Sequence, residues 1–356
     1  MKTGRTLLLL GAVALVAACN GDGGEGTISP PETDASPETL SILSHDSFAN
    51  EVTDETFAAF TESTGIAVEA VPAGDAGGAV NQAILTKDNP IADILFGVDD
   101  TFLSRALDEE IFIPHESELL NTVHPDLIVD DQHRVTPIDF GDVCLNYDIA
   151  WFEDNDLDPP ESLDDLVAPE YRGLLVTEDP AASSPGLAFL LATIDRYGSD
   201  WTGYWESLVA NDVQIVTDWD TAYYSDFTRY GGDYPIVVSY ASSPPAEVMF
   251  ADPPVDTAPT GVVTDGCYRQ IEFAGILANG EHPEESAGLI DFMLSPEFQE
   301  GIPTTWFVFP ANDSVELPEV FAENTVIPED PTTLDTAEIA ANRDDWLSQW
   351  QRVVTP

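Results

Sequence analysis

Two adjacent tyrosines, Tyr223 and Tyr224, follow a tryptophan in the stretch TDWDTAYYSDF, which covers Thr217–Phe227. Adjacent phenols can offer two oxygen ligands to a ferric ion, because hard cations prefer oxygen. Aromatic rings can instead hold a flat organic cation, and an aspartate on each side of Trp219 adds negative charge. The same residues therefore suit two different binding chemistries.

Helical geometry argues against two tyrosines that share one ion. A regular helix turns by about 100° per residue, so neighbouring side chains diverge, and the stretch has no Gly or Pro that would break a helix. Tyr223, Phe227 and Tyr230 have the spacing of one buried helical face. We therefore expect Tyr223 to lie in the core and Tyr224 to lie at most at the edge of a cleft.

Other aromatic side chains are expected at the ends of strands. Trp219 directly follows the apolar segment VQIVT, Tyr240 ends PIVVSY, and Trp306 lies within GIPTTWFVFP. Aromatic planes beside a carboxylate such as Asp75 suit a flat cation, which is held by cation–π contact and by charge. An iron site would leave these three rings without a role.

Ser183 and Ser184 precede Pro185 in the segment EDPAASSPGLAFLL. Serine before a proline is typical of a capped helix N-terminus. If that N-terminus faces a cleft, its hydroxyls and free N–H groups also suit a hydroxyl or phosphate group. The sequence leaves both interpretations open.

These residues need a framework of alternating strands and helices. Strand-like and helical segments alternate twice along the chain, which predicts an α/β fold with a parallel sheet covered on its faces. In such sheets ligands bind beyond the carboxyl ends of the strands. The polar residues expected there are His45, Asp46, Ser47, Gly74, Asp75, Asp99 and Asp100.

Two long strands, over 134–148 and 267–277, separate the two series of strands and helices. This organisation predicts two lobes joined by two hinge strands, with the ligand in the cleft. Residues 40–139 and 268–356 would form lobe one, and residues 140–267 would form lobe two.

The N-terminus has the form of an export signal. Residues 1–18 combine two basic residues with an apolar run, and VAAC resembles a lipoprotein cleavage site with Cys19 as the lipidated residue. Residues 19–39 would form a flexible tether. The alternative is cleavage near Ala18 and a freely secreted protein.

The charge of the chain excludes several function classes. Removing residues 1–18 removes two of the eleven basic residues and no acidic one, so the formal charge changes from −55 to −57. A nucleic-acid binder needs a basic surface, which this chain lacks. The many acidic residues suggest a salt-rich habitat, in which counterions screen the repulsion.

The sequence has no motif that predicts catalysis or a metal site. It lacks a P-loop, a GxGxxG after a strand, HExxH, CxxC and a GxSxG nucleophile elbow. Its five histidines are scattered. We therefore expect a binding protein with no cofactor and no bound metal.

Two further cysteines, Cys144 and Cys267, lie at the two long strands. An exported protein meets an oxidising environment, so a disulfide between these strands is plausible. It would require Cα atoms within about 7 Å. Two buried thiols, which behave as small apolar side chains, are the alternative.

Several of these segments together resemble one known family, the thiamine-binding lipoproteins or periplasmic proteins of ABC importers. The resemblance runs from about Leu40 to Val353. It rests on HDSF, ADILFGVDD, PIDFGDVCLNYD, DPAASSPGLAFLL, TDWDTAYYSDF, VVSYASSPP, FMLSPEFQEGIPTTWFVFPA and WLSQWQR. It implies a hinge-closing, monomeric protein that binds thiamine or its phosphates and delivers it to a membrane permease.

The resemblance also implies a set of ligand residues. Candidate contacts are Asp46, Asp75, Ser183, Ser184, Trp219, Tyr240 and Trp306. His45 stands where the family usually has a tyrosine, and Tyr224 stands where related proteins have a small residue. These two departures keep open a ferric-binding alternative of the same fold class, which would use Tyr223, Tyr224 and His45.

Overall fold

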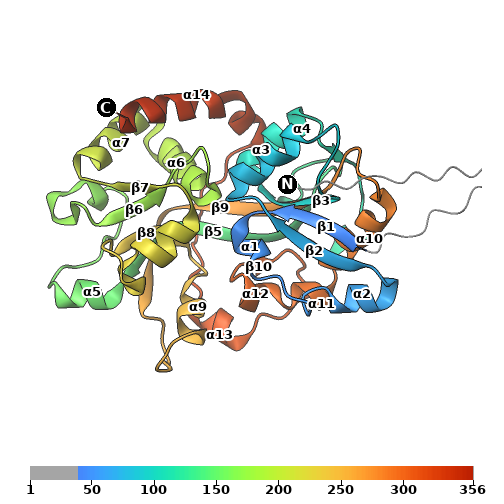
Figure 1. Cartoon of the computed structure of the whole chain (residues 1–356). Helices are drawn as coiled ribbons and strands as arrows, with labels where there is room; N and C mark the ends of the chain where they lie inside the picture. The colour runs from blue at the N-terminus through green and yellow to red at the C-terminus, as the bar shows by residue number, and fades with distance from the viewer. Residues whose placement is uncertain (1–38, 356) are drawn as a thin grey trace, which may run out of the picture. The chain divides into compact units, whose positions relative to one another are not determined.

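A computed structural model describes residues 39–355 of the chain (Figure 1). The expected signal peptide, Cys19 and the tether up to residue 38 lie outside the described residues. Among residues 39–355, no helix is both long enough and apolar enough to cross a membrane.

The described strands form one mixed sheet, in the order β2-β1-β3-β9-β5-β8-β6-β7, with β4 paired to β9 and β10 paired to β5. The strands are β1 (Thr39–Ser44), β2 (Ala67–Pro72), β3 (Ile94–Asp99), β4 (Phe112–Ile113), β5 (Thr136–Asp148), β6 (Leu175–Glu178), β7 (Gln214–Val216), β8 (Ile236–Tyr240), β9 (Thr260–Leu277) and β10 (Phe309–Pro310).

The expected parallel pairing holds only within two groups of strands. β1 pairs in parallel with β2 and β3, and β6 pairs in parallel with β7 and β8. The long strands β5 and β9 run antiparallel to each other and to their outer neighbours β8 and β3. The α/β class and the parallel pairing within each series of strands are confirmed, and the two long strands join the two groups through antiparallel ladders.

The strand β9 begins earlier than its sequence indicates. It starts at Thr260 rather than near Cys267, because Thr260 pairs with Asp148 at the far end of β5. The pairing shifts register between Val143 and Leu145, so the two strands continue past an irregularity. The division into lobes at residues 140 and 267 stays a prediction.

Helices cover the sheet (Figure 1). They are α1 (Asp46–Ala49), α2 (Ala58–Thr64), α3 (Ala76–Leu85), α4 (Asp100–Asp108), α5 (Ile149–Asp154), α6 (Ser184–Tyr197), α7 (Trp201–Ala210), α8 (Trp219–Thr221), α9 (Pro244–Met249), α10 (Pro283–Met293), α11 (Pro296–Gln299), α12 (Ile302–Thr305), α13 (Glu319–Asn324) and α14 (Thr336–Val354).

Strand ends and helix starts are coupled through aspartate caps. Asp99 ends β3 and caps α4, where its Oδ1 accepts a hydrogen bond from the Phe102 N–H at 3.1 Å. Asp148 ends β5 and caps α5 in the same way. Each cap thereby joins the end of a strand to the start of the helix that follows it.

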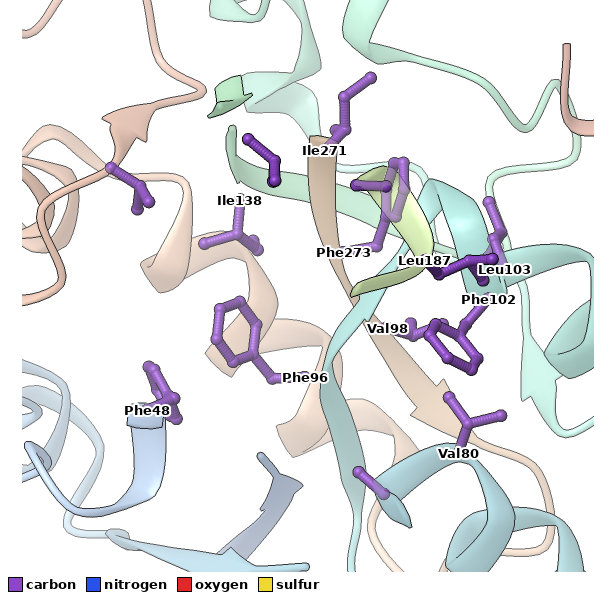
Figure 2. Close-up of a cluster of buried hydrophobic side chains, with 14 of the residues drawn as sticks. Phe48, Val80, Phe96, Val98, Phe102, Leu103, Ile138, Leu187, Ile271 and Phe273 are labelled. Atoms are coloured by element: carbon purple, nitrogen blue, oxygen red, sulfur yellow. The ribbon is translucent and has the colours of Figure 1, made fainter. Parts of the chain in front are cut away.

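The core lies between the sheet and these helices (Figure 2). Phe273 of β9 and Phe102 of α4 are fully buried, and Phe48 of α1 is 1% exposed. Figure 2 also shows Val80 of α3 and Leu187 of α6 among these side chains. One continuous apolar cluster therefore supports elements from both groups of strands.

The C-terminal helix α14 packs against both α4 and α7 (Figure 1). Its Trp350 is 3% exposed and meets the buried Trp205 of α7 edge to face, with ring centroids 5.6 Å apart. Trp346 is partly buried and packs on the same core. Both residues are packing residues, as their spacing predicts.

The stretch around the paired tyrosines is not a regular helix. After the short α8, residues Ala222–Asp226 form a π-helical turn, and the Phe227 N–H donates to the Ala222 carbonyl at 3.0 Å. Phe227 is extended, and a 3₁₀ turn follows over Thr228–Tyr230. The expected continuous helix through Tyr230 is therefore wrong, because the chain leaves the helix at Phe227 to bond with Tyr234.

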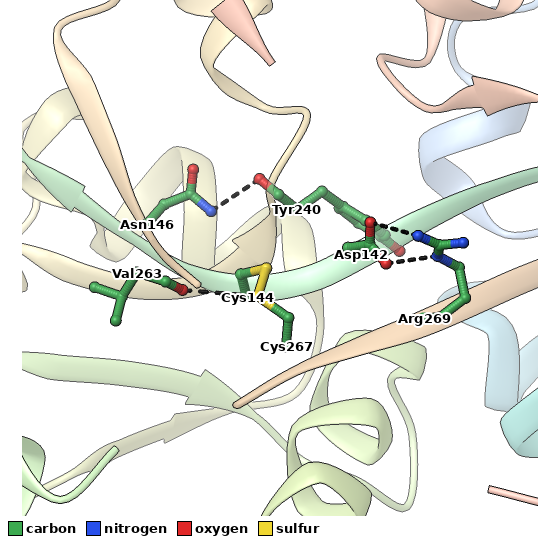
Figure 3. The surroundings of a disulfide bond; sticks show 7 residues. All are labelled: Asp142, Cys144, Asn146, Tyr240, Val263, Cys267 and Arg269. Atoms are coloured by element: carbon green, nitrogen blue, oxygen red, sulfur yellow. Dashed lines mark hydrogen bonds and ion pairs between the residues drawn. A yellow bond between two sulfur atoms is a disulfide. The ribbon is translucent and has the colours of Figure 1, made fainter. Parts of the chain in front are cut away.

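Cys144 of β5 and Cys267 of β9 form a disulfide, with Cα atoms 4.4 Å apart (Figure 3). Its sulfurs are buried beside Ala241 and Val262. The structure thus selects the cross-linked alternative over two free thiols, and the link joins the two long strands.

Candidate functional site

A cavity of about 530 Å³ lies at the carboxyl ends of the strands, where sequence reasoning places the ligand. Its volume is in the range that accommodates small-molecule ligands. Its lining comes from segments far apart in the sequence: His45, Ser47, Phe48, Asn50, Glu51, Asp75, Ala76, Phe96, Asp139, Ser184, Pro185, Trp219, Asp220, Tyr223, Tyr224, Tyr240, Ser243, Ala246, Phe250, Glu272, Thr305, Trp306, Phe307 and Val308.

Asp75 connects two parts of this lining. Its Oδ1 caps α3 by accepting from the Ala76 N–H at 2.7 Å, and its Oδ2 accepts from the Trp219 N–H at 3.3 Å. Burial raises the pKa of Asp75 above its ordinary value, although the Ala76 hydrogen bond and the charge of His45 oppose the rise. A positively charged ligand beside this carboxyl group would favour its ionised form.

Two more hydrogen bonds cross the cavity region. The Ser47 hydroxyl donates to Asp220 Oδ1 at 3.3 Å, and the Gly77 N–H donates to the Ala182 carbonyl at 3.0 Å. A side chain at Gly77 would put a Cβ 2.6 Å from that carbonyl oxygen. The first residues of α3 therefore approach the 179–183 loop closely, and the two sides of the cavity are in contact.

Trp219 is held in one orientation. Its indole Nε1–H donates to the Ser239 hydroxyl at 3.1 Å, and its ring stacks on Tyr223 with centroids 5.0 Å apart and an angle of 19°. Tyr223 thus covers one face of the indole. A rigid aromatic plane in a cavity wall is a suitable platform for a flat cation.

The paired tyrosines have different environments. Tyr223 is 2% exposed, and its hydroxyl donates to Glu247 Oε1 at 2.9 Å. Tyr224 is 51% exposed at the cavity, and the two rings are nearly perpendicular, at 81°. The prediction of a core Tyr223 and a cleft-edge Tyr224 is confirmed, although the backbone between them is a π-turn.

Glu247 of α9 binds further polar groups from this region. It is 3% exposed, accepts from the Tyr230 hydroxyl at 2.8 Å and pairs with Arg229 at 2.9 Å. Burial, with the nearby charge of Glu247 as the next cause, raises the pKa of Tyr223 well above its ordinary value. The Tyr223 hydroxyl is therefore part of a buried hydrogen-bond cluster around Glu247.

Tyr240 and Trp306 form other parts of the wall. The Tyr240 hydroxyl donates to Gln270 Oε1 at 3.0 Å, and its ring lies against Gly141, where a Cβ would come within 2.8 Å of the ring (Figure 3 shows Tyr240 beside β5). Trp306 lies nearly parallel to Phe48 and Phe298, at 22° and 27°. Its buried Nε1–H has no hydrogen-bond partner among residues 39–355.

His45 faces the cavity from the end of β1. Its Nδ1 accepts from the Phe48 N–H at 3.2 Å, and its Nε2 lies 3.5 Å from Glu272 Oε1. Gly97, at φ 82°, leaves room for the imidazole ring. Burial, the largest single cause, lowers the pKa of His45, but the charge and hydrogen bonding of Glu272 and the charges of Asp75 and Asp220 together outweigh it, so the net pKa is raised.

Asp139 and Glu272 are direct cross-strand neighbours in the β5–β9 ladder. Like charges at opposed positions destabilise a sheet. Burial, together with the charge of Glu272, raises the pKa of Asp139 well above its ordinary value. This pair can relieve its repulsion by holding a proton or by facing a cation.

Of the three remaining candidates, only Ser184 is among the lining residues, and Asp46 and Ser183 are not. Asp46 accepts from the Gly74 N–H at 2.9 Å and is not among the lining residues. Ser183 occupies the N-cap position of α6, but its buried hydroxyl makes no cap hydrogen bond. Ser184 lines the cavity, and its hydroxyl has no partner within the described part of the chain.

An aromatic pair lies at the rim of the cavity. Phe250, at the end of α9, is 72% exposed, and its ring meets Phe307 edge to face with centroids 5.7 Å apart. Phe307 has a left-handed backbone, with φ 56°, which is unfavourable for a residue other than glycine. The pair therefore joins the α9 side of the cavity to the segment that follows α12.

Sequence comparison identifies the family. Residues 89–340 match the family described as bacterial extracellular solute-binding protein. The chain belongs to this family. It is 30% identical to the thiamine-binding periplasmic protein of Escherichia coli (strain K12) over 280 residues, 78% of this chain and 80% of that protein. It is 29% identical to the Brucella suis biovar 1 (strain 1330) protein of the same name over 316 residues, 88% of this chain and 91% of that one.

Solved structures agree with this assignment. The structure of a periplasmic thiamin binding protein covers 92% of this chain and 99% of its own, with a TM-score of 0.79 and 27% identity. Iron-bound HitA from Pseudomonas aeruginosa has a TM-score of 0.71 at 21% identity, over 89% of this chain and 99% of its own, which shows a shared fold. The family resemblance and the two-lobed α/β fold predicted from the sequence are confirmed.

Sequence reasoning missed several residues of this solute-binding protein. The sequence pattern places Asp139 and Glu272 only within long strands, and it gives no prediction for Phe250 and Phe307. The first two had a detectable signal, because PIDFGD and RQIEFAG place an acidic residue among the apolar residues of a buried strand. The rim phenylalanines had none, since contacts between distant loops leave no local pattern.

Proposed function

We propose that this chain is the extracytoplasmic solute-binding component of an ABC importer and that it captures thiamine in the cavity described above. The observation that carries the proposal is the chemistry of the lining, which combines fixed aromatic planes with carboxyl groups. Thiamine carries a flat, positively charged thiazolium ring, which suits cation–π contact and charge pairing. The names of the relatives support the same ligand.

In this proposal three rings form the walls of the binding site. Trp219 stacks on one of the two rings of thiamine, and Tyr240 and Trp306 complete the enclosure. Asp75 offsets the positive charge or bonds the aminopyrimidine. Ser184 offers its free hydroxyl, while Asp46 and Ser183 act through the segments that they support.

The two lobes, 40–139 with 268–356 and 140–267, close on the ligand by bending at β5 and β9. The hydrogen bonds of Asp75 with Trp219 and of Ser47 with Asp220 support this idea, because each joins one proposed lobe to the other. They would have to break when the cleft opens.

The cellular context follows from the same proposal. Cleavage before Cys19 and lipidation of that residue would anchor the protein to the outer face of the cell membrane. A monomer would then deliver thiamine to the permease of the importer, without catalysing a reaction. The acidic composition supports a salt-rich habitat.

The ferric alternative has less support. Of its three donor residues, Tyr223 has its hydroxyl bonded to Glu247. The paired tyrosine rings also diverge at 81°.

A paired titration of intrinsic fluorescence tests the proposal. Thiamine should quench the tryptophan emission, and the quenching should saturate at one thiamine per protein molecule. Ferric citrate should leave the emission unchanged. Mass spectrometry of protein purified without added ligand should detect a thiazolium compound. No response to thiamine, together with a phenolate–iron absorption band that is lost in Tyr224→Phe, would assign the protein to iron instead.

A further inference from the structure

Two carboxyl groups face each other across the ladder between β5 and β9, inside the cavity. Asp139 and Glu272 are cross-strand neighbours, and both line the cavity. Asp139 is 4% exposed, and its Oδ1 has no hydrogen-bond partner among residues 39–355. Glu272 Oε1 accepts from the Gln270 Nε2–H at 3.2 Å and lies 3.5 Å from His45 Nε2. A buried carboxyl oxygen without a partner is unfavourable unless a proton or a ligand satisfies it.

No arginine or lysine is among the lining residues of the described chain. Arg269 lies on the same strand as Glu272, but it is bonded to Asp142 (Figure 3). Two neighbouring carboxyl groups that lack a cation share a proton more readily than they both ionise. Burial, followed by the charge of Glu272, accordingly raises the pKa of Asp139 well above its ordinary value. The ligand-free pair therefore holds a proton.

The other carboxyl groups of the lining have partners or are open to solvent. Both oxygens of Asp75 accept backbone N–H hydrogen bonds, at 2.7 and 3.3 Å. Asp220 accepts from the Ser47 hydroxyl at 3.3 Å, and Glu51 is exposed. Among the lining residues of the described chain, Asp139 is the carboxyl group with a buried oxygen that has no partner. The pair that it forms with its neighbour is therefore the site at which a cation finds an unused acceptor.

We infer that the Asp139–Glu272 pair is the counterion of the ligand's cationic ring and that the pair releases its proton to solvent when the cation binds. The ligand adds one positive charge and the pair loses one proton, so the net charge of the occupied site equals that of the ligand-free site. This inference rests on the proposed function, because thiamine supplies the cation. It leaves Asp75 to bond the aminopyrimidine.

Several neighbouring groups also titrate and have to be separated from the pair. They are His45 after β1, Asp99 at the end of β3, Tyr240 at the end of β8, and Asp75 and Asp220 beside His45. A protonated His45 would also oppose a cation as the pH falls. The test therefore needs variants of the pair itself.

Calorimetry in two buffers of different ionisation enthalpy measures the number of protons released per bound ligand. At about pH 7, the wild-type protein should release a fraction of a proton, up to about one, per thiamine. Because binding releases a proton, the affinity should rise as the pH rises from about 6 to about 8. Asp139→Asn leaves one carboxyl group without a neighbour that shares its proton. This variant should abolish the proton release and the dependence of affinity on pH.

Two further variants test the charge of the pair. Asp139→Asn/Glu272→Gln removes both carboxyl groups at nearly unchanged volume. At about pH 8 it should weaken thiamine binding about tenfold or more, the scale of one carboxylate about 5 Å from a cation at an effective dielectric constant of about 40. Asp93→Asn is the matched control, because Asp93 is also buried, at 9% exposed, and lies outside the lining. It should leave the affinity and the proton release unchanged, and urea unfolding establishes that each variant is folded.

The outcomes separate the inference from the proposed function. If thiamine does not bind to the wild-type protein, the proposed function fails. If thiamine binds without releasing a proton, or if the double variant binds within about twofold of wild type at about pH 8, the inference is wrong and thiamine binding stands. His45→Asn keeps a side-chain acceptor for the cap of α1 but cannot titrate. Loss of the proton release in this variant, with retention in Asp139→Asn, would assign the proton to His45 and overturn the inference.

Discussion

Removing the disulfide between Cys144 and Cys267 should cost much of the stability of this fold. The two cysteines are separated by 123 positions in the sequence. The chain-entropy relation for a loop of this length gives a stabilisation of about 5 kcal/mol at 25 °C, because the link restricts the unfolded chain. Whole domains are stable by about 5–15 kcal/mol, so this one bond is a large share.

Urea unfolding followed by tryptophan fluorescence measures this contribution. The double variant Cys144→Ala/Cys267→Ala should unfold at a much lower urea concentration than the oxidised wild type. Wild-type protein with excess reductant should approach the variant. Val262→Ala is the matched control, because it trims the same apolar cluster without changing the covalent link, and it should cost only about 1 kcal/mol.

Two results would refute this reasoning. One is a loss of less than about 1 kcal/mol in the double variant, which would mean that loop closure contributes little here. The other is the titration of both thiols in unfolded, unreduced wild type, which would mean that the bond is absent in the protein.

The remaining predictions concern ligand binding and pH. Trp219→Ala should weaken thiamine binding by about 1–3 kcal/mol, because it removes a desolvated cation–π contact and buried apolar area. Tyr224→Phe should change the affinity little. Calorimetry that finds a larger loss of affinity in Tyr224→Phe than in Trp219→Ala would contradict the assigned roles. Burial raises the pKa of Asp100 to about 6, so the folded state binds this proton more tightly than the unfolded state. The contribution of this proton to stability is therefore present at low pH and is lost as the pH rises through 6. The free energy of unfolding of the ligand-free protein should increase by about 1 kcal/mol when the pH falls from 7 to 5. In urea titrations, Asp100→Asn should abolish this part of the dependence of the unfolding free energy on pH. Phe250→Ala should open the cavity rim, because it removes the contact with Phe307. Stopped-flow fluorescence should then show a several-fold higher dissociation rate of thiamine with little change in the association rate. An unchanged dissociation rate would show that the contact with Phe307 does not retain the ligand.

The sequence indicates much of the fold because its patterns are local. Gly65 follows an apolar helical run and ends α2, where its backbone is left-handed. Asp75 and Asp99 follow strand-like runs and cap the first turns of α3 and α4. The antiparallel role of β5 and β9 was not predictable in this way. Strand direction depends on which distant segments pair, and no local residue pattern records it.

The candidate site shows the same limit. Trp219 and Tyr240 could be placed at the cavity because each directly follows a strand, and strand ends meet at one edge of a sheet. The π-turn at Ala222–Asp226 was missed, since its sequence contains only ordinary helix residues and its geometry follows from the bond between Thr228 and Tyr234. Tertiary contacts override local preference there.

The order of strands in the sheet has a consequence for how the chain acquires its fold. The inner neighbour of β3 is β9, which is synthesised only after β5, β6, β7 and β8. Until β9 arrives, β3 has an unpaired edge, and unpaired edges favour association with other chains. The early strand β3 therefore stays incompletely paired until the late strand β9 is synthesised. The high negative charge of the chain causes mutual repulsion, which helps to keep such incompletely folded molecules apart.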